Sequence, residues 1–72
     1  MSREYSKMAV KQLKEIEQEV KKRPPGDEKA QATWLIERTR ELICTMDARI
    51  DDGLPITKNI DRIDEMLKIL SK

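Results

Sequence analysis

Three aspartates close to one glycine are the residues of this sequence that most resemble a metal-binding loop. Asp47, Asp51 and Asp52 precede Gly53 in the stretch MDARIDDGLPIT. In an EF-hand calcium loop, oxygen ligands occupy positions one, three and five, glycine occupies position six, and a bidentate glutamate occupies position twelve. With Gly53 at position six, Ala48 falls at position one and an asparagine falls at position twelve. Only Asp52 fits the pattern, so the spacing excludes a calcium loop of this kind.

The end of a helix explains the same residues better. Gly53 can adopt the left-handed conformation that ends many helices, and Pro55 prevents the helix from continuing. Two carboxylates beside a helix C-terminus oppose the helix dipole by at most about 1 kcal/mol, which a folded domain tolerates. The other interpretation of Asp51 and Asp52 is an acidic contact, either with a basic partner or with the first helix of this same chain.

Few residues in the sequence are suited to catalysis. The chain has no histidine, and its one cysteine, Cys44, has neither a histidine nor a helix N-terminus nearby to activate it. The cysteine and histidine sets that hold structural zinc are absent for the same reason. Neither glycine belongs to a Gly-rich phosphate loop, because each lies alone beside a proline. We therefore predict a protein that is not an enzyme and has no catalytic residue, cofactor, bound metal or small-molecule substrate.

A row of basic side chains follows one side of the segment before Pro24. At about 100° per residue, these side chains project within roughly 60° of one line, opposite the apolar residues of the segment. We call the following residues the lysine row: Arg3, Lys7, Lys11, Lys14, Lys21 and Lys22. Such a row can follow nucleic-acid phosphates and give salt-sensitive binding without sequence preference. The alternative is an ordinary solvated helix surface, and no aromatic side chains are interleaved for base stacking.

Trp34 is the other residue whose position is unusual. On a helical projection it lies about 140° from the apolar face of its segment, on the side of Arg38 and Glu41. Tryptophan on a polar surface is a common anchor for a protein partner or for self-association, so we predict that these three residues bind protein. The alternative is that Trp34 seals one edge of the core. Apolar residues beside the other core faces would extend the binding surface: Met8, Met66 and Ile69.

Two breaks divide the chain into three segments that can position these side chains. Prolines and a glycine meet at Pro24-Pro25-Gly26 and again at Gly53-Leu54-Pro55, and both combinations favour turns between helices. Asp27 and Thr57 follow these breaks and are predicted to be helix N-caps. The predicted helices cover approximately residues 3–23, 28–52 and 58–71.

Apolar residues at spacings of three and four predict one buried face on each helix. The three faces are formed by Tyr5, Ala9, Leu13, Ile16 and Val20; by Ala32, Leu35, Ile36, Leu42, Ile43, Met46 and Ile50; and by Ile60, Ile63, Leu67 and Leu70. No run alternates in the manner of a β-strand. We predict an all-α fold, a small antiparallel three-helix bundle that forms a single domain over residues 1–72.

Length and composition set further bounds. A chain of 72 residues makes one small domain, near the lower size limit of a stable core. Fifteen basic and fourteen acidic side chains nearly cancel, so the total charge selects no partner. The first segment is nevertheless richer in basic residues and the second in acidic ones. No apolar run has the length of a signal peptide core or a membrane span, so we expect an intracellular protein of the cytoplasm or nucleus that binds no membrane.

Two stretches of the chain resemble one protein family. MAVKQLKEI (8–16) and IERTRELICTMDARIDDGL (36–54) are similar to the first two helices of the helical domain near the C-terminus of CHD-type chromatin-remodelling ATPases. The matching residues are Val10, Lys11, Leu13, Lys14, Glu37, Thr39, Arg40, Arg49 and Ile50. The chain departs from the family at Asp47-Ala48, where the family has Gly-Asp. The resemblance implies an accessory domain that contacts DNA or nucleosomes, through Lys11 and Lys14.

Two functions follow from these observations. The first is a non-enzymatic helical module, an adaptor or regulator, that binds another protein or a second copy of itself. The second is an accessory domain that binds DNA, nucleosomes or RNA through Lys7, Lys11, Lys14, Lys21 and Lys22 of the lysine row.

Overall fold

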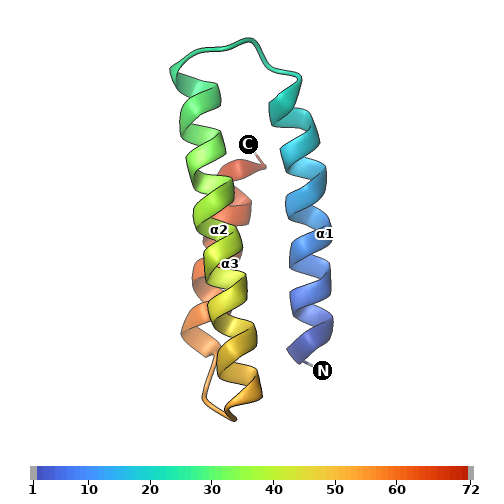
Figure 1. Ribbon diagram of the computed structural model, residues 1–72, viewed down its shortest axis with the longest axis vertical. Helices are drawn as coiled ribbons and strands as arrows, with labels where there is room; N and C mark the ends of the chain where they lie inside the picture. The colour runs from blue at the N-terminus through green and yellow to red at the C-terminus, as the bar shows by residue number, and fades with distance from the viewer. Residues whose placement is uncertain (1, 72) are drawn as a thin grey trace.

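The structure, a computed structural model, describes residues 2–71 and consists of three helices. They are α1 (Ser2–Lys21), α2 (Asp27–Asp51) and α3 (Thr57–Leu70). Figure 1 shows that α2 runs antiparallel to α1 and α3, and that all three lie along the long axis of the molecule. Residues 2–71 contain no strand. The predicted all-α three-helix bundle is therefore confirmed.

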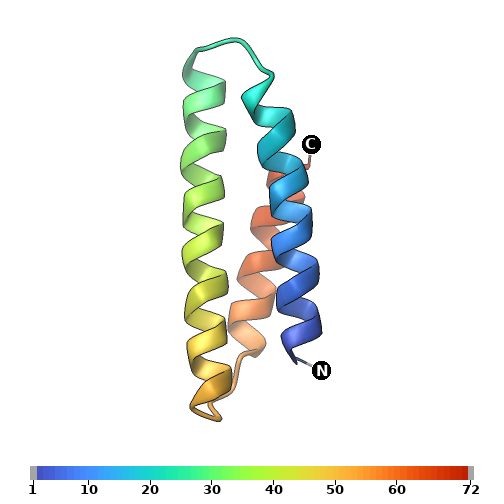
Figure 2. The same ribbon diagram turned by 45° about the vertical axis from the view of Figure 1, so that its right-hand side comes forward.

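The third helix is the shortest and does not reach the end of the bundle. In both ribbon views it starts at the lower end, beside the start of α1, and stops below the connection between α1 and α2 (Figures 1 and 2). We call that connection, residues 22–26, the upper turn and the connection at residues 52–56 the lower turn. The molecule extends 42 × 17 × 17 Å along its principal axes.

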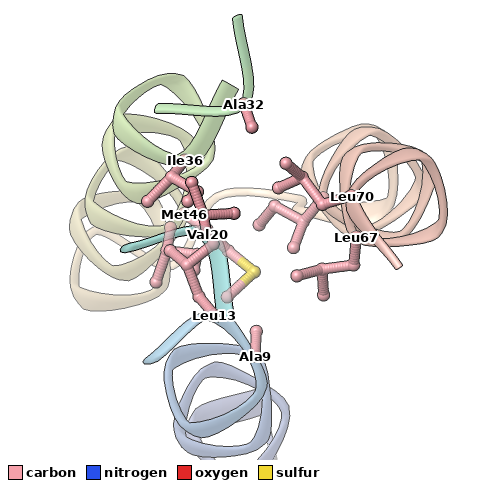
Figure 3. Close-up of a cluster of buried hydrophobic side chains, with 10 residues drawn as sticks. Ala9, Leu13, Val20, Ala32, Ile36, Met46, Leu67 and Leu70 are labelled. Atoms are coloured by element: carbon pink, nitrogen blue, oxygen red, sulfur yellow. The ribbon is translucent and has the colours of Figure 1, made fainter. Parts of the chain in front are cut away.

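The core forms where the three apolar faces meet. Its buried side chains are Ala9, Leu13, Val20, Ala32, Ile36, Ile43, Met46, Ile63, Leu67 and Leu70. All of them belong to the predicted faces, and the other members of those faces are half-buried against them. Met46 lies at the centre, and its thioether sulfur points into the space between the helices (Figure 3). Each large side chain removed from water in this way contributes about 1.5–3 kcal/mol, an upper estimate, to the stability of the fold.

Two hydroxyl residues are also buried, and the apolar periodicity did not predict them. Ser6 lies in α1 and Thr39 in the middle of α2. The Thr39 hydroxyl donates a hydrogen bond to the carbonyl oxygen of Leu35, one turn earlier in the helix, at 2.7 Å. Since this bond satisfies the hydroxyl within its own helix, the side chain can lie in the core without the cost of a bare polar group.

The C-terminus of α2 is closed as the sequence predicts. Gly53 has a φ of +70°, and its N–H donates to the Ile50 carbonyl at 3.1 Å. The N–H of Leu54 donates to the carbonyl of Arg49 at 2.8 Å. These two bonds form a Schellman motif, in which only glycine takes the left-handed conformation without strain. Gly53 therefore ends the helix and is not part of a metal loop.

The helix N-termini differ from the prediction. Asp27 and Thr57 are the first helical residues of α2 and α3, and the N-caps are Gly26 and Ile56, which make no side-chain capping bond. The prediction was wrong because both helices begin one residue earlier than expected, which places Asp27 and Thr57 inside the first turn and not at the cap. At α2, the carboxylates of Asp27 and Glu28 lie within the first turn, where negative charge stabilises the helix dipole.

Helix α1 also ends earlier than predicted, at Lys21. The residue before a proline is disfavoured in helical conformation, which affects Arg23. The N–H groups of Lys22 and Arg23 donate to carbonyls three residues back, Glu19 at 3.2 Å and Val20 at 3.1 Å. The last turn therefore tightens before the chain leaves the helix.

Polar contacts tie α1 to both other helices. The guanidinium of Arg3 donates to Asp51 at the lower end, so for that aspartate the structure shows the alternative interpretation, a contact with the first helix of the same chain. Higher up, Arg40 donates to Glu17 at 3.0 Å, and this bond holds the pKa of the Glu17 carboxyl below its usual value. Both pairs link α1 to α2 and are exposed or half-exposed, so each contributes little to stability.

Tyr5 makes the link between α1 and α3. Its hydroxyl lies 2.5 Å from Asp64 Oδ1, to which its single proton is donated, and 3.2 Å from the carbonyl oxygen of Ile60, a weaker second acceptor of the same proton. Burial raises the pKa of Tyr5, and the hydrogen bond to Asp64 and the charges of Asp64 and Asp61 raise it further. The neutral phenol is thus the form that the folded protein stabilises.

Candidate protein-binding surface

Trp34 lies on the outer side of α2 and is 61% exposed. It belongs neither to the buried core nor to the half-buried residues packed against it. Leu35, the next residue along the chain, occupies that edge of the core instead. The alternative in which Trp34 seals the core is therefore wrong. An indole ring of this size remains available to a partner.

Arg38 and Glu41 share this outer side of α2 with Trp34. Residues four apart on a helix are neighbours, so Arg38 lies one turn beyond the indole. Its guanidinium donates to Glu41 Oε2 at 3.2 Å, and both side chains are exposed. The helix thus brings together the three residues that the sequence assigned to protein binding, and the ion pair leaves their combined charge at zero.

A groove continues from these residues toward the lower turn. It lies between α2 and α3 and has a volume of about 690 Å³. Its lining consists of Arg38, Glu41, Leu42, Thr45, Arg49, Pro55, Thr57, Lys58, Asn59 and Arg62. The sequence analysis missed this groove, because its residues come from two helices and the turn between them. We call it the α2–α3 groove.

The α2–α3 groove is strongly basic. Four of its lining side chains are cationic, Arg38, Arg49, Lys58 and Arg62, and only Glu41 is anionic. Arg49 Nε donates to the Pro55 carbonyl at 2.9 Å, which holds the lower turn against α2. Within residues 2–71, Lys58 and Arg62 form no ion pair. The groove lining therefore carries excess positive charge, and two of its cations are not engaged in ion pairs within the described part of the chain.

Apolar side chains lie at the other end of the same side of the bundle. Ile69 of α3 is 52% exposed and lines a shallow hollow with Leu35 and Gln31 of α2. Met66, one turn before Ile69 on α3, is half-buried. Met8 is 49% exposed but belongs to α1, which contributes no residue to the α2–α3 groove. Of the three apolar residues that the sequence suggested as extensions, Met66 and Ile69 therefore lie on α3 beside α2.

The lysine row forms a separate surface on α1. Lys7, Lys11, Lys14, Lys21 and Lys22 are all exposed. The first four lie within the helix, and Lys22 follows it in the upper turn, where its ammonium lies 3.7 Å from Glu19. Arg3 is held by Asp51. The lysines of the row thus remain exposed on α1 and at the start of the upper turn, on a different helix from Trp34.

The remaining candidates for chemistry are dispersed. Asp51 pairs with Arg3, Asp52 is exposed, and Asp47 Oδ1 is buried without a hydrogen-bond partner within residues 2–71. In that same range no three cysteine, aspartate or glutamate side chains come together as metal ligands. Cys44 is a free, exposed thiol. None of the described helices is long and apolar enough to cross a membrane.

The fold and this surface define a small all-α bundle with an exposed tryptophan and a basic groove. In comparisons with known proteins, the chain matches no protein-family model, no curated protein and no solved structure. The resemblance to the helical domain of CHD-type remodellers therefore stays a prediction.

Proposed function

We propose that this protein is a non-enzymatic interaction module, an adaptor or regulator, that binds another protein or a second copy of itself through Trp34, Arg38 and Glu41. The exposed indole of Trp34 is the observation that carries the proposal. Large aromatic side chains on a protein surface are the residues most often found at the energetic centre of an interface. The fold does not use this ring, since the core is complete without it.

Replacing Trp34 by alanine tests the proposal. We expect Trp34→Ala to weaken association at least about tenfold, which is the effect of removing an interface residue worth roughly 2 kcal/mol. Self-association is measured by sedimentation equilibrium over a range of concentrations. Binding of a different protein is measured by retention of partners on the immobilised chain, followed by titration of each purified partner.

The matched control is Met8→Ala, which removes another exposed apolar side chain but from α1. Far-ultraviolet circular dichroism should show the same helicity for both variants, since neither residue belongs to the core. If Trp34→Ala associates as tightly as the wild type, or if Met8→Ala loses as much, the proposed surface is wrong.

The exposed lysine row favours nucleic-acid binding as a second candidate function, in line with the resemblance to chromatin remodellers. We expect wild-type protein to be retained on a DNA duplex or RNA at low salt and released as salt rises. Reversing Lys7, Lys11 and Lys14 to glutamate should abolish retention. Reversing Lys29, Lys58 and Lys68 to glutamate makes the same change in net charge outside the lysine row. This control variant should keep most of the retention on nucleic acid. Absence of retention by the wild type at low salt would remove this function.

A further inference from the structure

We propose that the α2–α3 groove receives an acidic segment of the partner protein, and that apolar side chains of the same segment cover Trp34 and Ile69. This inference rests on the proposed protein-binding function and names the chemistry of the partner. The segment has two parts: an acidic end that lies at the lower turn, and an apolar end that lies beside the last turn of α3.

The charge of the groove selects the acidic part. Lys58 and Arg62 extend from α3 into a concave surface without an ion pair inside the described chain, and Arg49 faces them from α2. Cations gathered in a groove repel one another and raise the local potential, so a complementary anionic chain is both attracted and oriented there. The only carboxylate in the lining, Glu41, is already held by Arg38.

The kind of cation also matters. Three of the four are arginines, whose planar guanidinium groups bind carboxylates with two parallel hydrogen bonds. The start of α3 adds to the effect: Thr57, Lys58 and Asn59 belong to its first turn, which contains no acidic residue and no side-chain cap. The uncapped N–H groups of such a turn carry partial positive charge and favour an anion, although they do not by themselves make a site.

The apolar end fixes the length of the segment. Trp34 and Arg49 are fifteen residues apart on one helix, which corresponds to roughly 22 Å at about 1.5 Å per residue. A helical segment of about 15 residues spans that length, as does an extended one of about seven. Carboxylates must therefore lie at one end of the segment and large apolar side chains at the other.

A nucleic acid fits this side of the bundle less well than a peptide does. A phosphate backbone that followed the groove upward would pass the carboxylates of Glu41 and Glu65, the second of which lies one turn beyond Arg62. It would then meet the apolar surface of Trp34 and Ile69, where the hollow beside Ile69 contains one cation, Arg23, and one carboxylate, Glu28. An acidic and apolar peptide matches both ends of the surface.

Two synthetic helical peptides test the inference. The acidic peptide, of about 20 residues, carries glutamates in one half and leucines in the other, and the neutral peptide has glutamine in place of each glutamate. Because Trp34 is the single tryptophan, its fluorescence reports occupancy of the surface directly. We expect the acidic peptide to bind at least about tenfold more tightly than the neutral one, with a difference that shrinks as salt is added.

Charge variants assign the effect to the groove. Lys58→Glu with Arg62→Glu should lower affinity for the acidic peptide by about tenfold or more, and Lys58→Gln with Arg62→Gln should lower it less. The matched control, Lys11→Glu with Lys14→Glu, makes the same change in net charge on α1 and should alter affinity less than about twofold. Circular dichroism should show unchanged helicity in all three double variants.

Each other outcome overturns the inference in a distinct way. If both peptides bound with equal affinity and Trp34→Ala bound neither, the proposed function would stand, but an acidic segment would be excluded as the occupant of the groove. Equal losses in the α1 control would assign binding to total charge. A DNA duplex could also displace the peptide from the wild type. If the groove variant no longer bound that duplex while the α1 control still did, the groove would be a nucleic-acid site. If the acidic peptide did not bind at about 1 mM, an acidic and apolar segment would be excluded as the ligand of the groove.

Discussion

The upper and lower turns of the bundle both contain proline and glycine but are held very differently. In the upper turn, residues 22–26, every side chain is exposed. In the lower turn, residues 52–56, the Schellman bonds close α2, Arg49 Nε holds the carbonyl of Pro55, and Ile56 packs against the core. Proline and glycine end a helix in both places, but only the lower turn has a side chain packed against the core and a side-chain hydrogen bond to its backbone.

Helix-ending residues therefore fix where a turn occurs, whereas packing decides how firmly it is held. The upper turn lies beyond the end of α3 (Figure 1), and among its side chains only Arg23 lines hollows with the last residues of that helix. The lower turn joins α2 to α3 and lines the α2–α3 groove with Pro55. The α2–α3 groove is therefore built at the firmly held end of the molecule, whereas Trp34 lies toward the other end of α2.

Lengthening each turn in the same way should give the largest difference in stability between the two ends of the bundle. Inserting Gly-Ser-Gly-Ser between Leu54 and Pro55 separates Arg49 from the Pro55 carbonyl and Ile56 from its place, so we expect a loss of about 1–2 kcal/mol in the free energy of unfolding. The same insertion between Pro25 and Gly26 should cost no more than about 0.6 kcal/mol, the entropy of a longer loop. Urea unfolding followed by circular dichroism measures both. Equal losses would show that the two turns are equally attached.

The glycine of the lower turn should give the next largest effect. Gly53→Ala forces an alanine into a conformation with φ near +70°, which should cost about 1 kcal/mol. No atom lies within 4 Å of the added methyl carbon, so the cost is conformational and not steric crowding. Asp52→Ala, at the neighbouring position with φ of −88°, is the control and should change stability by less than about 0.5 kcal/mol.

Tyr5 gives a further test of the lower end of the bundle, because it links α1 to the first turns of α3, just beyond the lower turn. Tyr5→Phe removes the hydrogen bonds to Asp64 and Ile60 and should cost about 0.5–1 kcal/mol at neutral pH. The raised pKa of Tyr5 means that this contribution is complete below about pH 10, the unfolded value, and is lost as pH rises through the higher folded value.

The test of that pH dependence is a pair of urea titrations at neutral and strongly alkaline pH. The stability difference between wild type and Tyr5→Phe should shrink at alkaline pH, and a difference that stays constant would contradict the assignment. Other groups that titrate there are common to both proteins and cancel.

The smallest effect should come from the upper turn. Lys29 Nζ donates to the Lys21 carbonyl at 3.2 Å, a bond across the ends of the two helices that flank this turn. Lys29→Ala removes that bond but leaves the carbonyl open to water, so we expect a change within about 0.5 kcal/mol. A loss as large as that of Gly53→Ala, measured in the same urea titrations, would mean that the upper turn is held more firmly than its exposure indicates.

Local patterns in the sequence predicted most of the fold. Spacings of three and four specify which side of each helix is buried, and every residue of the core follows them. The burial of Thr39 was not predicted because threonine is a polar residue type. In the structure its hydroxyl is satisfied within the helix by the hydrogen bond to the Leu35 carbonyl. The N-caps were wrong because Asp27 and Thr57 have suitable side chains, while the position of a cap depends on backbone conformation at the preceding residue.

The candidate site could be predicted only in part, for a different reason. The position of Trp34 on α2 follows from its angle to the apolar face of its own helix, so one segment contains the information. The α2–α3 groove joins Arg38 and Arg49 to Lys58 and Arg62, and no local pattern relates the two helices. The contact between Tyr5 and Asp64, 59 residues apart, was missed for the same reason.

The elongated shape of the molecule has a consequence for its rotation in solution. At 42 × 17 × 17 Å, the protein is more than twice as long as it is wide, and all three helices lie along the long axis. Helical N–H bonds point along the same axis. Their nuclear magnetic relaxation is therefore governed by slow end-over-end tumbling, and transverse rates should be uniform along α1, α2 and α3. A partner bound lengthwise beside α2 and α3 would make this tumbling more isotropic, whereas end-to-end pairing of two copies would make it less so.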